Sequence, residues 1–506
     1  MLKNVKILFV ALTALCAVSC LDKVPQSAIP QQQAMQTFDD AEQTVTGIYS
    51  LLKSSALYSG YLTILPDLQT DLVYAVDGYS NTYGNFWLWT IRSTTSEIES
   101  VYASLYQIIA SCNFYLDYVP RVVAATTDEN KLNDLNTYTG EVYAIRALAY
   151  SELLKCYCKA YKPETAEREL GVVLRTTTLD KQPLPRASLY DSYQQVIKDL
   201  ERAEELLDED NDAYSSAFVT RAMALALHAR VALYMEDWQS AVKYSTELIE
   251  SRNFALSSAV SYYTNNMTYF DYMWNYDVAT EIIWRIGFTT TSYGGALGQS
   301  FLGFNVDYTY YYPDYVPAQW VLDLYSNSDM RYSSYFYTLP TGYNHGLQWP
   351  LLVKYFGNQD FINNALIYHT VMPKPFRLAE QYLIRAEALC RQQTPNFSAA
   401  TKDINTLRAA RIVSGGGVNL TADNYIEQIA AERVRELYME GFRLHDFKRW
   451  GELYRGGEGF TRTPQSNSLT EGSSLSVKAD DPLFVWPIPI HEIEAPGSLV
   501  QPNESN

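Results

Sequence analysis

Apolar residues recur at helical spacing through most of the chain, and three stretches repeat one order of residue types. Residues 141–149 (EVYAIRALA) and 380–388 (EQYLIRAEA) are identical at six positions, and residues 221–224 (RAMA) repeat their core. Each stretch opens a helix whose small residues let a partner helix approach closely. We therefore predict a mainly α fold built from helix pairs. The predicted pairs are 39–56 with 97–119, 136–161 with 189–207, 217–235 with 238–251, and 376–393 with 397–411.

The pattern changes between about residues 252 and 375, where Gly, Ser, Thr, Asn and Tyr dominate. Sixteen of the 42 tyrosines lie between Tyr262 and Tyr343, and neither a helical nor an alternating period runs through them. Short apolar runs such as residues 281–286 predict strands. The expected organisation is a discontinuous, tetratricopeptide-like helical scaffold that carries an aromatic, loop-rich and partly β second lobe. The scaffold is expected at 38–255 and 376–451, the lobe at 256–375, and a C-terminal extended segment at 452–506.

The N-terminal residues have the pattern of a lipoprotein export signal. Lys3 and Lys6 precede an apolar run over residues 7–18 that is too short to span a bilayer, so residues 1–19 are predicted to be a signal peptide. The sequence Ala-Val-Ser-Cys ending at Cys20 is typical of a lipoprotein cleavage site, and we expect acyl chains on Cys20. Residues 20–37 would then form a lipidated tether. The alternative is a soluble secreted protein that is cut nearby.

Charge and cysteine content exclude further classes. The formal charge is −18 and becomes −20 without residues 1–19, which hold two lysines and no acidic residue. Such a surface repels phosphates, so we expect no nucleic-acid partner. The remaining cysteines show neither a CxxC pair nor spacing suited to zinc, and buried thiols are favoured over a disulfide framework. These cysteines are Cys112, Cys156, Cys158 and Cys390.

A charged stretch at residues 432–450 reads ERVRELYMEGFRLHDFKRW. Opposite charges at i,i+3 spacing favour ion pairs along a helix face, each worth a few tenths of a kcal/mol if the helix is exposed. Gly441 is expected to end the first helix of the stretch. The three spaced pairs are Glu432 with Arg435, Arg433 with Glu436, and Glu440 with Arg443.

This stretch resembles the ERxxELxxEGxRxxDxxRW signature of the SusD/RagB-like family, with Phe447 where the family usually has Leu. The resemblance continues over residues 376–388, 403–408 and 486–492, and partly over 501–503. Members of that family are surface nutrient-binding lipoproteins of Gram-negative bacteria. The resemblance implies a SusD-like fold on the extracellular face of the outer membrane. It also implies a glycan ligand and a SusC-like TonB-dependent transporter as partner.

Two segments combine aromatic rings with Asn and Asp, a mixture that suits sugars because rings stack on sugar faces while amides and carboxylates bind hydroxyls. They are residues 77–87 and residues 305–312, the latter followed by Trp320. The resemblance places ligand contacts in loops of these two regions without fixing individual residues. The alternative is that the aromatic rings pack an irregular lobe. The candidate ligand-binding residues are Tyr79, Asn81, Tyr83, Asn85, Trp87, Asp307, Tyr308, Tyr310 and Trp320.

Enzyme motifs are not found in the sequence. Its five histidines form no HExxH motif, there is no GxSxG elbow, and 57 acidic residues make a pair of carboxylates uninformative. No cofactor is expected; a structural calcium stays open, since no DxDxDG spacing demands one. We predict a non-enzymatic protein that binds an oligosaccharide or polysaccharide and delivers it to the transporter. The alternatives are a receptor for peptides or another polymer, a surface hydrolase, and a purely structural partner of the transporter.

Overall fold

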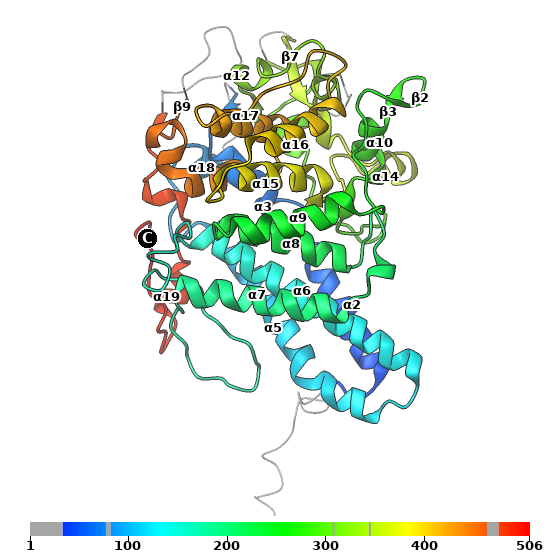
Figure 1. Cartoon of the computed structure of the whole chain (residues 1–506), viewed down its shortest axis with the longest axis vertical. Helices are drawn as coiled ribbons and strands as arrows, with labels where there is room; N and C mark the ends of the chain where they lie inside the picture. The colour runs from blue at the N-terminus through cyan, green and yellow to red at the C-terminus, as the bar shows by residue number, and fades with distance from the viewer. Residues whose placement is uncertain (1–33, 77–81, 306, 308, 344–345, 463–474) are drawn as a thin grey trace, which may run out of the picture.

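The computed structural model describes residues 34–76, 82–305, 307, 309–343, 346–462 and 475–506. Cys20, the predicted lipidation site, lies outside these residues. Helices make up most of the fold, and short strands occur in pairs (Figure 1). The long helices are α2 (Phe38–Leu51), α5 (Ser96–Ala125), α6 (Glu129–Tyr157), α7 (Leu189–Leu206), α8 (Arg221–Tyr234), α9 (Trp238–Glu250), α15 (Leu378–Arg391), α16 (Phe397–Ala409) and α17 (Tyr425–Leu437).

The four predicted helix pairs are confirmed. Helix α2 packs on α5, α6 on α7, α8 on α9, and α15 on α16. Helix α7 also packs on α8, and α9 on α15, so the pairs stack on one another although a long insertion separates the last pair in sequence (Figure 1). This is the tetratricopeptide-like, mainly α architecture expected from the internal repeat.

Side-chain caps and small residues explain why these segments form tightly packed helices. Ser188, Thr220 and Asp237 each accept a hydrogen bond from a backbone N–H in the first turn of α7, α8 and α9. In α8 every residue from Ala222 to Tyr234 is buried, because alanines let the neighbouring helices close around it. The stack therefore forms a rigid support for the loops that leave it.

The remaining chain forms short strands and short helices. The sheets are two-stranded and antiparallel: β1 (Val73–Ala75) with β5 (Tyr315–Pro317), β2 (Tyr262–Thr264) with β3 (Met267–Thr268), β4 (Ile282–Trp284) with β8 (Phe376–Arg377), β6 (Phe336–Pro340) with β7 (Gln348–Leu352), and β9 (Phe460–Arg462) with β10 (Leu475–Val477). The shorter helices are α3 (Tyr61–Leu68), α4 (Gly84–Trp87), α10 (Tyr269–Tyr276), α11 (Gln299–Leu302), α12 (Gln319–Leu322), α13 (Arg331–Tyr335), α14 (Gln359–Ala365), α18 (Arg443–Trp450) and α19 (Ile490–Glu494). The strand predicted within residues 281–286 is confirmed as β4.

The charged stretch at 432–450 is buried, which distinguishes it from an exposed helix with surface ion pairs. Glu432 pairs with Arg435 at 2.9 Å, as the spacing predicted. The other two predicted pairs do not form among the described residues, because their members have partners elsewhere. Those partners are Asp446 for Arg433, Arg331, Arg377 and Arg411 for Glu436, Lys354 and Arg377 for Glu440, and Asp71 for Arg443.

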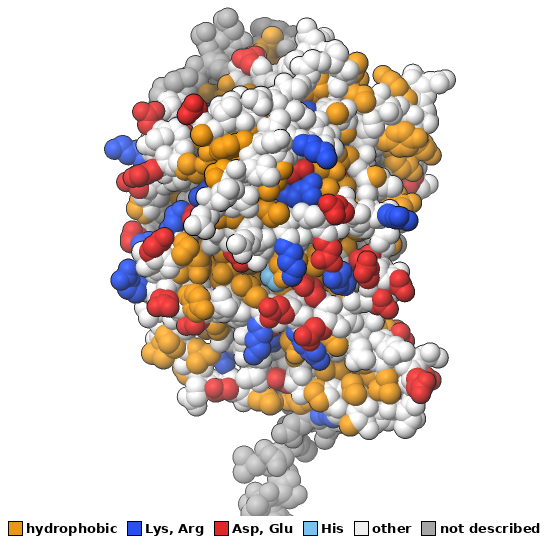
Figure 2. All heavy atoms as spheres, in the orientation of Figure 1, with side chains coloured by type: hydrophobic (Ala, Val, Ile, Leu, Met, Phe, Trp, Pro, Cys, Tyr) orange, Lys and Arg blue, Asp and Glu red, His pale blue; other side chains and the backbone are white. Residues whose placement is uncertain are grey.

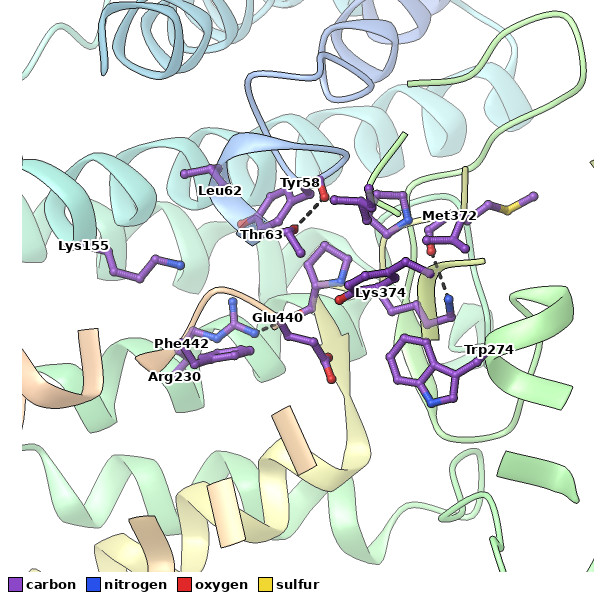
Figure 3. Close-up of a pocket in the computed structure, with 15 residues that line it drawn as sticks. Tyr58, Leu62, Thr63, Lys155, Arg230, Trp274, Met372, Lys374, Glu440 and Phe442 are labelled. Atoms are coloured by element: carbon purple, nitrogen blue, oxygen red, sulfur yellow. Dashed lines mark hydrogen bonds between the residues drawn. The ribbon is translucent and has the colours of Figure 1, made fainter. Parts of the chain in front are cut away.

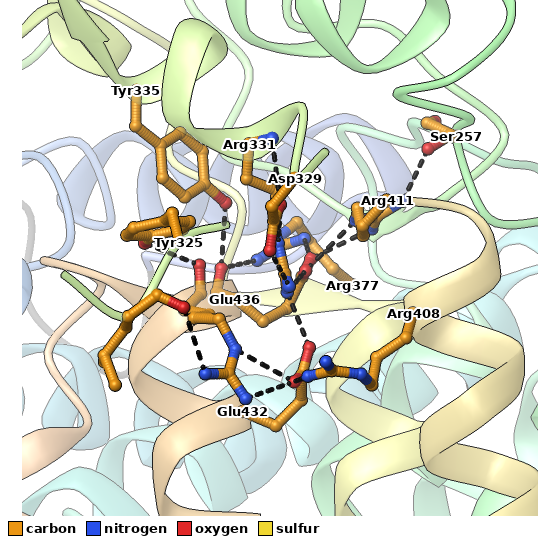
Figure 4. A network of polar contacts seen from close by, with 12 residues as sticks. Ser257, Tyr325, Asp329, Arg331, Tyr335, Arg377, Arg408, Arg411, Glu432 and Glu436 are labelled. Carbon is orange, nitrogen blue, oxygen red and sulfur yellow. Dashed lines mark hydrogen bonds and ion pairs between the residues drawn. The ribbon is translucent and has the colours of Figure 1, made fainter. Parts of the chain in front are cut away.

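The long-range ion pairs around Glu436 form one network (Figure 4). Glu436 on α17 lies 2.9 Å from both Arg377 and Arg411 and 3.1 Å from Arg331. Glu281, at the start of β4, pairs with the same Arg377 (2.7 Å) and Arg411 (2.8 Å). All five side chains are at most 1% exposed. Because the charges come from segments far apart in sequence, the network ties the lobe to the helical stack.

Cysteines 112, 156, 158 and 390 are buried and unpaired, as predicted for structural thiols. Within the part of the chain that the structure describes, no helix has both the length and the apolar composition needed to cross a membrane.

Candidate ligand-binding site

The β1–β5 sheet brings the two predicted loop regions together. The strands run antiparallel, with Ala75 at the end of β1 opposite Tyr315 at the start of β5. The chain that leaves β1 and the chain that enters β5 therefore lie at the same end of the sheet. The hydroxyl of Tyr315 donates a hydrogen bond of 2.6 Å to the carbonyl oxygen of Thr82, which joins the two regions directly.

A cavity of about 350 Å³ opens beside this end of the sheet. That volume lies within the usual range for small-molecule sites, about 300–1,000 Å³. Four segments line it: the loop between α2 and α3, the start of α4, the segment leading into α11, and the residues before β5. The lining residues are Ser55, Ser59, Gly60, Tyr61, Ile64, Thr82, Tyr83, Gly295, Ala296, Gln299, Ser300, Tyr312 and Asp314.

Close backbone approach fixes the wall of the cavity. The N–H of Gly295 donates a hydrogen bond of 2.9 Å to the Ser59 hydroxyl. A Cβ atom at Gly295 would lie 2.5 Å from the Ser59 carbonyl oxygen, a distance that side chains do not tolerate. Glycine is thus required where the α2–α3 loop and the segment before α11 meet.

Three tyrosine rings face the cavity from different elements. Tyr61 and Tyr83 contact each other edge to face, with ring centroids 5.7 Å apart. Tyr312 is 44% exposed and rests edge to face against Tyr343 at 5.6 Å. Burial raises the pKa of Tyr83 to about 12, so its hydroxyl stays protonated and able to donate. Tyr83 also has a left-handed backbone (φ 56°), a strained conformation that is frequent at binding sites.

The polar groups of the cavity suit a neutral ligand rich in hydroxyls. Among the described residues that line it there is no Lys, Arg or His, and Asp314 is the one carboxylate. Gln299 is exposed, and its side-chain amide makes no hydrogen bond to another described residue.

Apart from the two tryptophans, the predicted site residues fall into three groups in the structure. Tyr83 lines the cavity. Asn85, Asp307 and Tyr310 are exposed outside its lining, with the Tyr310 ring lying over Gly346. Tyr79, Asn81 and Tyr308 lie outside the described residues.

The two predicted tryptophans are packed against protein. Trp87 is buried, donates a hydrogen bond of 3.3 Å to the Val73 carbonyl oxygen, and is covered by the Arg462 guanidinium 4.3 Å from its ring centroid. Trp320 is half-buried and donates a hydrogen bond of 2.7 Å to the Asp71 carbonyl oxygen. Both indole N–H groups are therefore bound to backbone carbonyl oxygens in or next to β1, and Trp87 has little surface left for a ligand.

Sequence analysis missed several lining residues. Tyr61 and Gln299 lie outside the two aromatic segments, and Asp314 follows the second segment by two positions. Tyr312 belonged to that segment but was not selected. The usable signals were glycines: Gly60 before Tyr61, and the Gly294–Gly295 pair before Gln299, both of which mark close backbone contacts.

A second, internal cavity lies between the scaffold and the lobe (Figure 3). Lys155, Arg230, Trp274, Lys374 and Glu440 are among its lining residues. Its volume of about 30 Å³ accommodates one or two water molecules at about 10–15 Å³ each, far less than a sugar ring needs. In the described ranges, no group of three or more His, Cys, Asp or Glu side chains is arranged to hold a metal ion.

Comparisons with known proteins agree on one family. A model described as the SusD family matches residues 263–505, and one described as starch-binding, associating with the outer membrane, matches residues 20–233. The SusD-like protein P38 of Formosa agariphila is 24% identical over 541 residues, which cover 96% of each chain.

Solved structures share the fold. A SusD superfamily protein from Bacteroides thetaiotaomicron superposes with a TM-score of 0.75 at 21% identity, covering 92% of this chain and 99% of that one. A SusD-like carbohydrate binding protein from Bacteroides vulgatus superposes with a TM-score of 0.66 at 22% identity, covering 88% and 89% of the two chains.

Proposed function

The chain belongs to the SusD/RagB-like family, and on that premise we propose that it binds an oligosaccharide or polysaccharide in the cavity beside the β1–β5 sheet and passes it to a TonB-dependent transporter. The ligand is bound and released without chemical change. An acylated Cys20 would hold the protein at the outer membrane with the cavity on the extracellular side. Capture next to the transporter would raise the local ligand concentration at its entrance.

The observation that carries this proposal is the composition of the cavity. Tyr61, Tyr83 and Tyr312 offer rings for stacking on sugar faces, while Gln299 and Asp314 offer groups for hydroxyls. The described residues of the lining include no basic side chain, which supports a neutral sugar over a peptide, whose carboxylate terminus and acidic side chains favour cationic partners. A peptide receptor is therefore the less favoured alternative.

The test is calorimetric titration of Tyr83→Ala and Tyr312→Ala, singly and together, with oligosaccharides from a panel of neutral glycans. Each single substitution is expected to weaken binding about tenfold, or about 1.4 kcal/mol, because a stacking surface is lost. Tyr214→Ala serves as the control, since Tyr214 is 50% exposed and lies outside the cavity. Unchanged affinity in correctly folded Tyr83 and Tyr312 variants would remove the cavity from the binding site.

A further inference from the structure

A second group of tyrosines lies on the surface away from the cavity. We define the outer tyrosine patch as Tyr262, Tyr263, Tyr269, Tyr272 and Tyr276. Figure 2 shows hydrophobic-type side chains, tyrosine among them, gathered on the projection where Figure 1 places β2, β3, α10 and α14. None of the patch residues lines the cavity beside β1–β5.

The rings of the patch form a continuous series. The Tyr263 ring lies 5.8 Å from Tyr269 and 4.5 Å from Tyr272 between centroids. Tyr272 in turn stacks on Tyr276 at 4.7 Å with an interplanar angle of 25°. Tyr262, Tyr263 and Tyr269 are each about half exposed. Such a series offers several adjoining aromatic surfaces to one extended ligand.

The patch is held rigidly from below. Phe270, Met273 and Trp274 form the buried face of α10, while the patch tyrosines of that helix take the outer positions at helical spacing. Thr268 and Asp271 close a capping box at the helix start, which fixes the β3–α10 junction. Rigid rings lose little entropy when a ligand binds, so the surface is pre-organised.

The polar groups around the patch are available for hydrogen bonds to a ligand. Within the described part of the chain, no patch hydroxyl and no side-chain amide of the nearby asparagines makes a hydrogen bond to another residue. By contrast, the buried tyrosines 315, 335, 355 and 438 each donate to a backbone carbonyl oxygen. Free hydroxyls and amides beside exposed rings are suited to recognition of a hydroxylated ligand. The asparagines are Asn265 and Asn266 in the β2–β3 turn, Asn275 on α10, and Asn363 and Asn364 on α14.

The charge of the segments around the patch indicates which class of ligand could bind there. No Lys or Arg occurs between Arg252 and Arg285 or between Lys354 and Lys374, the two segments that form the projection. Asp360 on α14 lies close enough to Tyr272 to act on it electrostatically. Anionic polymers are therefore disfavoured. The exposed large apolar side chains here are tyrosines apart from Leu366, so the surface offers aromatic rings for stacking rather than aliphatic side chains.

We propose that the outer tyrosine patch is a second binding site for a neutral polysaccharide, on which it stacks another part of the same sugar chain that the cavity holds. This inference rests on the proposed function. A polymer that occupies both sites binds more tightly than either site alone allows, because the second contact is intramolecular. Short oligosaccharides that fill the cavity gain nothing from the patch.

The test compares polymer and oligosaccharide binding in the full chain. The patch variant carries Tyr263→Ala and Tyr272→Ala, and the matched control carries Tyr190→Ala and Tyr214→Ala, two tyrosines that are exposed elsewhere. Native affinity electrophoresis in gels containing amylopectin, xyloglucan or galactomannan measures polymer retention. Calorimetry measures the affinity for oligosaccharides of the retained polymer. We expect the patch variant to lose about three- to tenfold in retention while its oligosaccharide affinity stays within about twofold of the unmodified protein.

Retention of the patch variant equal to that of the control would overturn the inference, as would failure of every neutral polysaccharide to retain the unmodified protein. Failure of the proposed function gives a different result, namely unchanged oligosaccharide affinity in Tyr312→Ala. Adding the patch substitutions to Tyr312→Ala separates the sites, since any residual polymer retention should then disappear. As a second measurement, polymer should protect Tyr262 and Tyr263 from nitration, and equal nitration with and without polymer would argue against contact.

Discussion

The buried charge network and the aromatic cavity use polar groups in opposite ways. In the network, Glu436 and Glu281 both pair with Arg377 and Arg411, so these buried charges are neutralised by other protein groups. The hydroxyls of the outer tyrosine patch and the Gln299 amide of the cavity, by contrast, make no hydrogen bond to another described residue. The difference teaches that the strongest motif of this sequence encodes how distant segments of the fold join, whereas the proposed ligand contacts are residues that form no motif.

The most severe way to test this comparison is to remove one charge from the network. Glu436→Gln keeps the size of the side chain but removes the carboxylate that Arg331, Arg377 and Arg411 all contact. Breaking a buried ion pair on one side costs about 3–5 kcal/mol of unfolding free energy. Urea denaturation should show this loss while oligosaccharide binding by the folded fraction persists.

The matched control is Glu205→Gln, which removes the same charge from an exposed i,i+3 pair with Arg202. Surface pairs contribute about 0–1 kcal/mol, so this variant should unfold close to the unmodified protein. Equal losses in the two variants would contradict the assignment of the network as the structural joint.

Acid should weaken the charged region. Burial by itself raises the pKa of Glu387, but Arg449 at 2.5 Å, with Arg391 and Arg433, outweighs it and lowers that pKa to about 2. Because the folded-state pKa is depressed, the stabilisation is present above about pH 4.5 and is lost as pH falls towards 2, to the extent of about 3 kcal/mol. The pKa of Glu436 is lowered to about 2 against the same effect of burial, mainly by Arg411 and Arg377, and acts in the same direction.

Two other carboxyl groups act in the opposite direction. Burial raises the pKa of Asp67 and of Glu141 to about 7, so both favour the folded state as pH falls from 7 towards 4. Denaturation at pH 7, 5 and 3 should therefore show stability rising from pH 7 to 5, through Asp67 and Glu141, and falling between pH 5 and 3, where Glu387 and Glu436 are protonated in the unfolded chain but not in the folded one. Glu387→Gln should have a lower unfolding free energy at pH 7, and that free energy should fall less steeply in acid than in the unmodified protein. If it falls as steeply as in the unmodified protein and in the Glu205→Gln control, the assignment is refuted.

Much of the scaffold could be predicted because its information is local. The repeated small residues at 141–149, 221–224 and 380–388 led to the correct helix pairs. The partners of Glu436 could not be found in this way, since i,i+3 spacing identifies neighbours on one helix. It gives no information about Arg377 or Arg331, which the tertiary fold brings to Glu436 from other segments.

The sequence predicted two candidate regions but not the residues that line the cavity. Aromatic and amide content selected the loops, and the β1–β5 pairing that joins them involves only three residues on each side. Which ring faces solvent depends on cover from distant segments. Arg462 covers Trp87, whereas Tyr312 remains exposed, and composition does not distinguish the two cases.

A substitution with a milder expected effect displaces the cavity wall but keeps the aromatic and polar side chains of the lining. Gly295→Ala places a Cβ atom 2.5 Å from the Ser59 carbonyl oxygen, so the α2–α3 loop must shift. We expect about 1–2 kcal/mol of lost stability and a several-fold loss of oligosaccharide affinity, measured by denaturation and calorimetry. Gly47→Ala is the control, because nothing lies within 4 Å of a Cβ atom at Gly47. An affinity equal to that of the control would show that the wall is adaptable.

The smallest change in oligosaccharide affinity is expected for a substitution of Asn85, which lies just outside the proposed site. Asn85 belongs to the aromatic segment that favoured binding, but it is exposed outside the cavity and its side-chain oxygen lies 3.5 Å from the Thr90 hydroxyl. Asn85→Ala should change oligosaccharide affinity by less than about twofold. Gln299→Ala removes an amide from the cavity itself and should cost about three- to tenfold, the value of one hydrogen bond of about 1 kcal/mol. Comparable losses at both positions in calorimetry would extend the site onto α4, and would mean that the aromatic segment locates the site better than the cavity does.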